Sequence, residues 1–398
     1  MVYGYSVMLN TDYKVSPITG SFDELDLISI IIHRIIGGDP CSVNWEWFKG
    51  VIIYHEIIPF AYLSLKDSNL SVPEDLMQLL RNNYYYALRR CQECRQEFLR
   101  ILKEFENCRI SILPIKGMQF LYDIYARLPA RPMVDIDLLV KEDDILKAEE
   151  LFSNLGYKKE LYGLKEEYWR KDYCHLIFLR KEGRKTFIAE LHWGLDFKRK
   201  NRMVLDELWK RTREIDADGK RIKLLSAEDA FFSLALHNRR FGKPLNIKYA
   251  VDLILLLNKH SCQFDWDYIL SQCRKYNLSA PVFFSLYQAE FLRSLNIPEY
   301  VRKELKIPRW KKRLIQRFIE KNTFPLKTKT LPQIKSLYLK SHFLLYDSLR
   351  EPVSYVLNIP KEQFAKYYRL RPYTKKTAFL YRNRLFYMLF KSVSLFKK

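Results

Sequence analysis

Two aspartates, Asp135 and Asp137, lie one residue apart inside the apolar stretch VDIDLLV. Because a β-strand sends alternate side chains to opposite faces, both carboxylates share one face and their backbones lie about 6.6 Å apart. The other face carries only aliphatic side chains, which is typical of a core. Carboxylates at this spacing can converge on one metal ion, or on a pair of ions about 3.5–4 Å apart. The stretch therefore predicts a metal-binding strand; the alternative is an exposed sheet face with incidental aspartates.

A third carboxylate occurs in the stretch FIAELHW, where the same alternation places Glu190 and His192 on one face. If this strand neighbours the first, Asp135, Asp137 and Glu190 form an acidic cluster suited to a hard cation such as Mg²⁺. Such a trio fits two-metal phosphoryl chemistry, in which both ions stabilise the charge of the transition state. His192 is expected to support Glu190 or to touch substrate; the alternative is a structural histidine.

Basic residues precede the aspartate strand. The apolar run ISILPIKG ends at Lys116 and Gly117. A glycine at a strand-to-helix junction lets backbone N–H groups approach a phosphate. Lys116 supplies a single ammonium charge for a triphosphate. Arg131 could supply a planar guanidinium that donates two parallel hydrogen bonds, although it fits a surface position equally well. The segment therefore favours a phosphate-binding loop ahead of the acidic strand.

These residues resemble the uncharacterised bacterial and archaeal nucleotidyltransferases of the DNA polymerase β superfamily. The shared pattern is a Lys-Gly pair, an arginine, Asp-x-Asp on a strand, a helix that ends in Gly-Tyr and a later Glu-Leu-His-Trp. The resemblance is specific over about residues 110–200 and looser in the helices on either side. One departure is that Lys116-Gly117 stands where the superfamily usually has Gly-Ser.

The resemblance implies an α+β fold: a minimal polymerase β-like core of mixed sheet and helices, flanked by N- and C-terminal helical regions. It implies catalytic, metal-binding roles for Asp135, Asp137 and Glu190, with Mg²⁺ or Mn²⁺ as cofactor and an NTP such as ATP as substrate. Nucleotide binding is then expected from the remaining motif residues, namely Lys116, Gly117, Arg131 and His192.

Periodicity divides the chain into three parts. Apolar residues recur at helical intervals before residue 109, short strands alternate with helices over residues 109–205, and helical intervals return afterwards. We therefore expect an N-terminal helical region over 1–108, a nucleotidyltransferase core over 109–205 and a basic helical region over 206–398. In the last region Asp252 is costly to bury unpaired, so we expect it to meet His237, Arg239 or Arg240.

Positive charge is concentrated in the C-terminal half. The formal net charge is +22, and residues 301–330 hold eleven Lys/Arg against two Asp/Glu. Residues 361–398 hold eleven against one, interleaved with many aromatic side chains. Such a mixture suits phosphate contact plus base stacking, so an RNA acceptor such as a tRNA 3′ end is expected. The expected acceptor-binding residues are Lys375, Lys376, Arg382 and Arg384.

Other partners and roles stay open at this point. The same tail would fit an anionic membrane surface, or it would pack on the core with its charges in solvent. A protein, a small molecule or a saccharide is the alternative acceptor. A protein that binds nucleotide or RNA on the same scaffold without catalysis is the alternative to an enzyme.

Cysteine usage and the N-terminus bear on location. The chain has seven cysteines, and Cys91 and Cys94 form the one close pair. No second pair completes a zinc site, so both are expected to be reduced thiols on a helix. The first residues lack the charged start and apolar stretch of a signal peptide, and the longest apolar runs are too short to span a bilayer. A cytoplasmic protein is expected.

Overall fold

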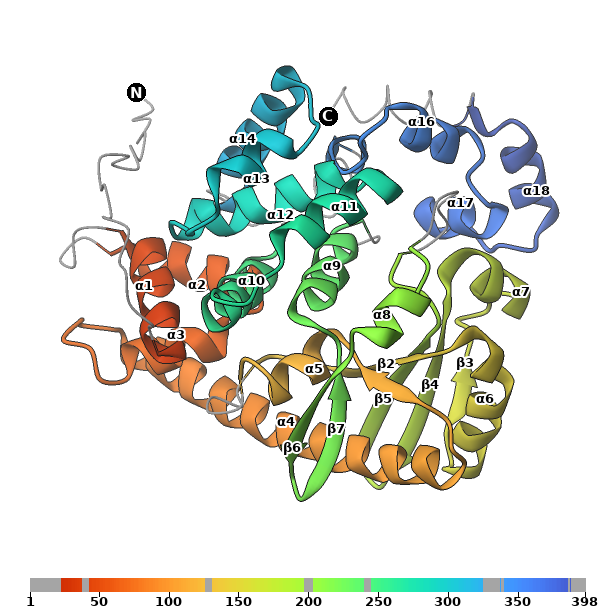
Figure 1. The fold of residues 1–398 in the computed structure, drawn as a ribbon, viewed down its shortest axis with the longest axis horizontal. Helices are drawn as coiled ribbons and strands as arrows, with labels where there is room; N and C mark the ends of the chain where they lie inside the picture. The colour runs from red at the N-terminus through yellow and green to blue at the C-terminus, as the bar shows by residue number, and fades with distance from the viewer. Residues whose placement is uncertain are drawn as a thin grey trace.

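The computed structural model describes residues 23–37, 43–125, 131–196, 203–239, 245–324 and 340–385, with the single positions 337 and 387. Within these ranges, every helix is too short or too polar to cross a lipid bilayer. Figure 1 shows a central sheet with helices around it and further helices toward the C-terminus. The expected mixture of a small mixed sheet and helical regions is confirmed.

The central sheet has five strands: β1 (Ile112–Pro114), β2 (Asp135–Val140), β3 (Lys158–Glu160), β4 (His175–Glu182) and β5 (Lys185–His192). Their spatial order is β1-β2-β5-β4-β3. β2 and β5 are parallel, and the other neighbouring pairs are antiparallel. The sheet is therefore mixed, and the strand with the two aspartates lies directly beside the strand with Glu190.

Four helices precede the sheet: α1 (Glu24–Ile36), α2 (Trp45–Tyr54), α3 (Ile58–Leu65) and α4 (Glu74–Asn107). α4 begins with two acidic residues, which the helix dipole favours in a first turn. Its apolar side chains recur at intervals of three and four residues, so they form one buried face against α3 and β2. Figure 1 shows α4 running along the molecule beside the sheet.

Three helices are interleaved with the strands: α5 (Lys116–Tyr122), α6 (Ile145–Asn154) and α7 (Glu166–Tyr168). A 3-10 turn at Glu142–Asp144 leads into α6, and a π-helical turn at Trp169–Tyr173 leads into β4. On β2, Ile136, Leu138 and Val140 are fully buried on one face, as the alternation predicted.

A second sheet, a hairpin of β6 (Arg213–Ala217) and β7 (Lys220–Leu224), was not predicted. Its turn residues Asp218 and Gly219 have φ of 54° and 70°. Asp-Gly with positive φ at both positions is the type I′ turn that matches the twist of a hairpin, so the signal was present in the sequence. The Asp218 carboxylate accepts hydrogen bonds from Arg95 at 2.7 Å and Tyr122 at 3.1 Å, which holds the tip against α4 and α5.

The remaining helices form the C-terminal half: α8 (Asp206–Lys210), α9 (Ala227–His237), α10 (Ile247–His260), α11 (Trp266–Tyr276), α12 (Ser279–Leu292), α13 (Glu299–Glu304), α14 (Arg309–Thr323), α16 (Arg350–Leu357), α17 (Lys361–Tyr367) and α18 (Lys375–Arg382). Helices α9, α10 and α12 pack on one another. The Tyr373 hydroxyl accepts a hydrogen bond from the backbone N–H of Lys165 at 2.8 Å, which ties the tail to the segment before α7.

A buried ion pair joins the core to the C-terminal half. Arg131, which precedes β2, donates to Asp252 of α10 through Nε at 2.8 Å and Nη2 at 2.6 Å. The Tyr125 hydroxyl adds a third bond to the same carboxylate at 2.8 Å. The expected partners of Asp252 were therefore wrong: His237 bonds Tyr249 instead.

The other two expected partners are Arg239 and Arg240. Arg239 pairs with Asp196 at 3.0 Å, and Arg240 lies outside the described residues. The planar fork of Arg131 matches both oxygens of the Asp252 carboxylate.

Arg131→Met is expected to lower the free energy of unfolding by about 3–5 kcal/mol, because it leaves the Asp252 carboxylate buried without its cation. Adding Asp252→Asn should recover part of this loss, since the buried charge is gone while Tyr125 keeps an acceptor. Urea unfolding of both variants measures the difference.

Arg89→Met is the matched control, because Arg89 is exposed on α4 and pairs with Glu93 at the surface. Its loss should cost less than about 1 kcal/mol. Equal losses for Arg89→Met and Arg131→Met would contradict the account of the buried pair.

Candidate active site

The three predicted carboxylates meet on one face of the sheet. The parallel register pairs Asp137 of β2 with Glu190 of β5, and paired residues on neighbouring strands share a face. Asp135 lies two residues earlier on the same face. One carboxylate oxygen from each residue lies within 4.8 Å of the other two. The structure thus brings Asp135, Asp137 and Glu190 together, as the strand alternation predicted.

Lys116 places a positive charge on this cluster. Its Nζ forms an ion pair with Asp137 and lies 4.0 Å from Glu190 Oε2. The residue begins α5 with a φ of 51°, a region that side chains rarely adopt and that occurs at functional sites. The preceding Ile115 N–H donates to the Asp137 carbonyl at 3.0 Å, so the chain delivers Lys116 directly beside β2.

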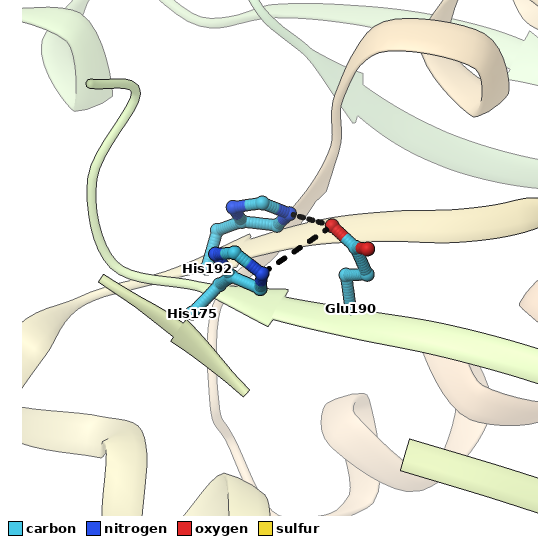
Figure 2. Close-up of side chains that lie close together, drawn as sticks. All are labelled: His175, Glu190 and His192. Carbon is cyan, nitrogen blue, oxygen red and sulfur yellow. Dashed lines mark ion pairs between the residues drawn. The ribbon is translucent and has the colours of Figure 1, made fainter. Parts of the chain in front are cut away.

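Two histidines flank Glu190. His192 Nε2 lies 2.8 Å from Asp137 Oδ1 and 3.2 Å from Glu190 Oε2. His175 Nε2 lies 3.9 Å from the same Glu190 oxygen, and Figure 2 shows both rings directed at it. Both imidazoles are buried. His192 therefore takes the predicted place beside Glu190.

His175 was missed by the sequence analysis. The antiparallel register of β4 and β5 pairs it with His192, so it shares the face of the cluster. The available signal was the short turn between two adjacent strands, because that turn sets which residues face each other.

The electrostatics separate the three carboxylates. Burial raises the pKa of Asp135 to about 7, and the negative charges of Asp137 and Glu190 add to this rise. Burial also acts on Asp137, but the Lys116 charge and the His192 hydrogen bond outweigh it and lower its pKa to about 2. For Glu190, His175, His192 and Lys116 together outweigh burial and hold the pKa well below its usual value.

Gly117 follows Lys116 and lies against Arg131. A Cβ on Gly117 would lie 2.8 Å from Arg131 Nη1, so no larger residue fits without moving the guanidinium. That guanidinium is held in place by its two bonds to Asp252. The structure thus puts Arg131 behind the first turn of α5, where it is 3% exposed.

Lys248, like His175, was missed by the sequence analysis. It lies in the first turn of α10 and is buried, with Nζ 2.6 Å from Glu56 Oε2. Burial lowers its pKa, and the nearby Arg131 charge adds to this effect. Its positive charge acts on Asp135, so the C-terminal half also contributes to the site.

The donor set fits a hard divalent cation. Mg²⁺ and Mn²⁺ prefer carboxylate oxygens, and three of these oxygens lie within 4.8 Å here. The pKa of Asp135 is raised mainly by burial and then by the charges of Asp137 and Glu190, against which the Lys116 charge acts. A divalent ion held by Asp135, Asp137 and Glu190 would add positive charge to the cluster.

The predicted tail residues lie elsewhere. Lys375, Lys376 and Arg382 are exposed on α18, which Figure 1 shows at the edge of the molecule, apart from β2 and β5. Arg384 is half-buried and donates to the Leu357 carbonyl at 2.9 and 3.1 Å. Three of the four side chains are thus open to a partner, while the fourth holds the tail together.

A protein-family model described as an uncharacterised nucleotidyltransferase matches residues 42–293, which is more than half of the chain. The matched range includes every residue of the carboxylate cluster, Lys116 and both histidines. No curated protein and no solved structure matches the chain at a significant level.

Lys116→Met is expected to bind Mn²⁺ at least about tenfold more tightly than the unchanged protein when no nucleotide is present. The reason is that the lysine ammonium and a metal ion compete for Asp137, and two cations about 4 Å apart repel by several kcal/mol in a protein. Isothermal titration calorimetry measures the affinity.

Lys116→Arg keeps the charge and serves as the control, with an affinity close to that of the unchanged protein. If Lys116→Met binds Mn²⁺ no more tightly than Lys116→Arg, then the lysine does not compete for the carboxylates.

Proposed function

The chain belongs to a family of uncharacterised nucleotidyltransferases, and from that premise we propose that it transfers a nucleoside monophosphate from an NTP to an acceptor hydroxyl with Mg²⁺ or Mn²⁺. The observation that carries the proposal is the meeting of Asp135, Asp137 and Glu190 within 4.8 Å, beside a lysine. Placing three carboxylates close together on a largely buried face is costly. A reaction that needs a bound cation would account for the arrangement, because the cation stabilises the ionised carboxylates.

In the proposed reaction, the acceptor oxygen bonds to the α-phosphorus while the bond from that phosphorus to the β-phosphate oxygen breaks. Pyrophosphate leaves with the bonding electrons, and the acceptor proton passes to solvent water. When bound, the divalent ion polarises the acceptor oxygen and offsets the charge of the transition state.

Lys116 has two partners in this proposal. Without nucleotide it pairs with Asp137. With nucleotide its ammonium moves to the triphosphate, which frees Asp137 to hold the divalent ion. Gly117 then presents backbone N–H groups to a phosphate, and Arg131 stands behind this turn and fixes its position. His192 orients Glu190 and contacts the nucleotide.

We propose RNA as the acceptor. The support is the exposed row of Lys375, Lys376 and Arg382 on α18, together with Tyr373 and Phe379, which are 44% and 67% exposed. Basic side chains contact phosphates and exposed rings stack on bases, and together they bind a single strand. An anionic membrane surface is the competing partner for this tail.

The location and the division of the chain are also proposals. The described cysteines are free thiols, which favours a reducing compartment such as the cytoplasm. Burial raises the pKa of Cys91 to about 12 and of Cys94 to about 11, so both are inert thiols on α4. We also propose that the chain divides into an N-terminal helical region over 1–108, a nucleotidyltransferase core over 109–205 and a basic helical region over 206–398.

Asp137→Asn is expected to lower transfer of label from α-labelled NTPs to total RNA by roughly a thousandfold or more, because it removes a charge from the metal site. The amide keeps the size and shape of the side chain, so the thermal unfolding transition should remain. Gel separation of the labelled products also identifies the acceptor.

Asp143→Asn makes the same substitution at an exposed position just after β2, and it should transfer label as the unchanged protein does. Equal activity in Asp137→Asn would show that the chemistry lies elsewhere. Loss of the transition in Asp137→Asn would show that the aspartate is structural.

Replacing Lys375, Lys376 and Arg382 with Gln should flatten the dependence of RNA affinity on salt. Three lost phosphate contacts reduce the log–log slope by about 2 for a single strand. Fluorescence anisotropy at several salt concentrations measures this slope. Arg384 is left unchanged, because its bonds to Leu357 hold the tail together.

A triple Gln variant at the exposed Lys103, Lys147 and Lys158 removes the same charge from other surfaces, and its slope should stay unchanged. If the tail variant instead loses binding to anionic vesicles and keeps its RNA slope, the tail is a membrane contact. If it loses neither, the charges of the tail are only solvated.

A further inference from the structure

The two histidines and Glu190 form a second donor set beside the three carboxylates. One ring nitrogen of His175, one of His192 and one Glu190 oxygen all lie within 4.8 Å of one another. Figure 2 shows the His192 ring above the His175 ring, with the Glu190 carboxylate to the right of both. Two imidazoles and a carboxylate differ in chemistry from three carboxylates, because nitrogen donors favour transition metals over Mg²⁺.

The ring of His175 is oriented as in a metal ligand. Its Nδ1 lies 3.2 Å from the Tyr173 carbonyl, which only accepts hydrogen bonds, so Nδ1 carries the proton. A metal ion would bind at the other nitrogen, Nε2, in place of its proton, and Nε2 is the atom that faces Glu190. A histidine that binds metal typically donates its second N–H to a backbone carbonyl in this way.

The π-helical turn Trp169–Tyr173 fixes that orientation. The ring centroid of His175 lies 5.6 Å from that of Trp169 and 5.5 Å from that of Tyr173, both at steep angles. On its other side the ring stacks on His192 at 4.9 Å. π-helical turns are rare and are frequent at functional sites, and here the turn places two aromatic rings around one imidazole.

The donor separations fit a small ion with short bonds. Two donors about 2.0–2.1 Å from a tetrahedral Zn²⁺ lie about 3.3 Å apart. The separations from Glu190 Oε2 are 3.2 Å for His192 Nε2 and 3.9 Å for His175 Nε2. His192 Nε2 is therefore already at this separation from Glu190 Oε2, while His175 Nε2 must move closer and the two stacked rings must turn toward a common point.

We propose that His175, His192 and Glu190 form a binding site for a transition metal ion of the Zn²⁺ class, next to the oxygen site formed by Asp135 and Asp137. Two imidazoles with one glutamate and an open position is a donor set found in catalytic zinc sites. Glu190 is shared between the two sites, while the nitrogen donors belong to this one alone.

Occupancy of this site changes the carboxylate cluster. His192 Nε2 bonds either Asp137, at the present 2.8 Å, or a metal ion, since the ring nitrogen has one position for a partner. Zn²⁺ on His192 therefore takes the imidazole away from Asp137, while Asp137 keeps its ion pair with Lys116. The site thereby links transition-metal binding to the oxygen cluster through His192 and Glu190.

X-ray absorption at the zinc edge tests the proposal, because it counts the imidazoles bound to the metal. The full chain loaded with one equivalent of Zn²⁺ should show two, and His175→Gln should show one. A competing chelator should report an affinity at least about tenfold lower for His175→Gln, since losing a donor costs no less than losing an outer partner. An excess of Mg²⁺ should leave the zinc in place.

His33→Gln is the matched control, because His33 is exposed on α1 and its removal should change neither the count nor the affinity. The thermal transition of each variant shows that it is folded. Zinc without imidazole ligands, or equal zinc affinity in His175→Gln and the unchanged protein, would overturn the proposal. Because the readout needs neither NTP nor acceptor, failure of label transfer with intact zinc binding would count against the proposed function alone.

Discussion

Like-charged carboxylates repel one another, and three of them converge here within 4.8 Å on a largely buried sheet face. A positive charge must lie among them, and the ammonium of Lys116 supplies it from the first residue of α5. Burial, together with the charges of Asp137 and Glu190, still raises the pKa of Asp135 to about 7. The positive φ of Lys116 is part of this arrangement, because it occurs at the residue whose side chain pairs with Asp137 of β2.

Distant parts of the chain meet beside the carboxylate cluster. Arg131 and Asp252 lie 121 positions apart in the sequence and form a buried ion pair. The Arg131 guanidinium also lies against Gly117, in the turn that begins with Lys116. Lys248, from the same helix as Asp252, adds its charge to the surroundings of Asp135. Helix α10 therefore contributes to the electrostatics of a site whose carboxylates all come from the sheet.

Strand alternation is a local property, and for this reason the carboxylate face could be predicted from residues 134–140 and 187–193 alone. The place of His175 depends on the register of a hairpin, which the short turn between its strands could have given. The place of Lys248 depends on how a distant helix packs, which short-range patterns do not contain. Arg131 was missed as the partner of Asp252 because only basic residues near Asp252 in the sequence were considered, whereas Arg131 lies 121 positions away. The β6–β7 hairpin was predictable, because Asp218-Gly219 is a strong turn signal.

The central claim is that the three carboxylates hold a divalent ion while Lys116 moves to the nucleotide. Crystals grown with Mn²⁺ and a non-hydrolysable NTP test it directly, because manganese can be located by its anomalous scattering. The account predicts manganese bound to oxygens of Asp135, Asp137 and Glu190, with Lys116 Nζ on the triphosphate. A structure in which nucleotide is bound, no metal lies among these carboxylates and Lys116 still pairs with Asp137 would contradict it.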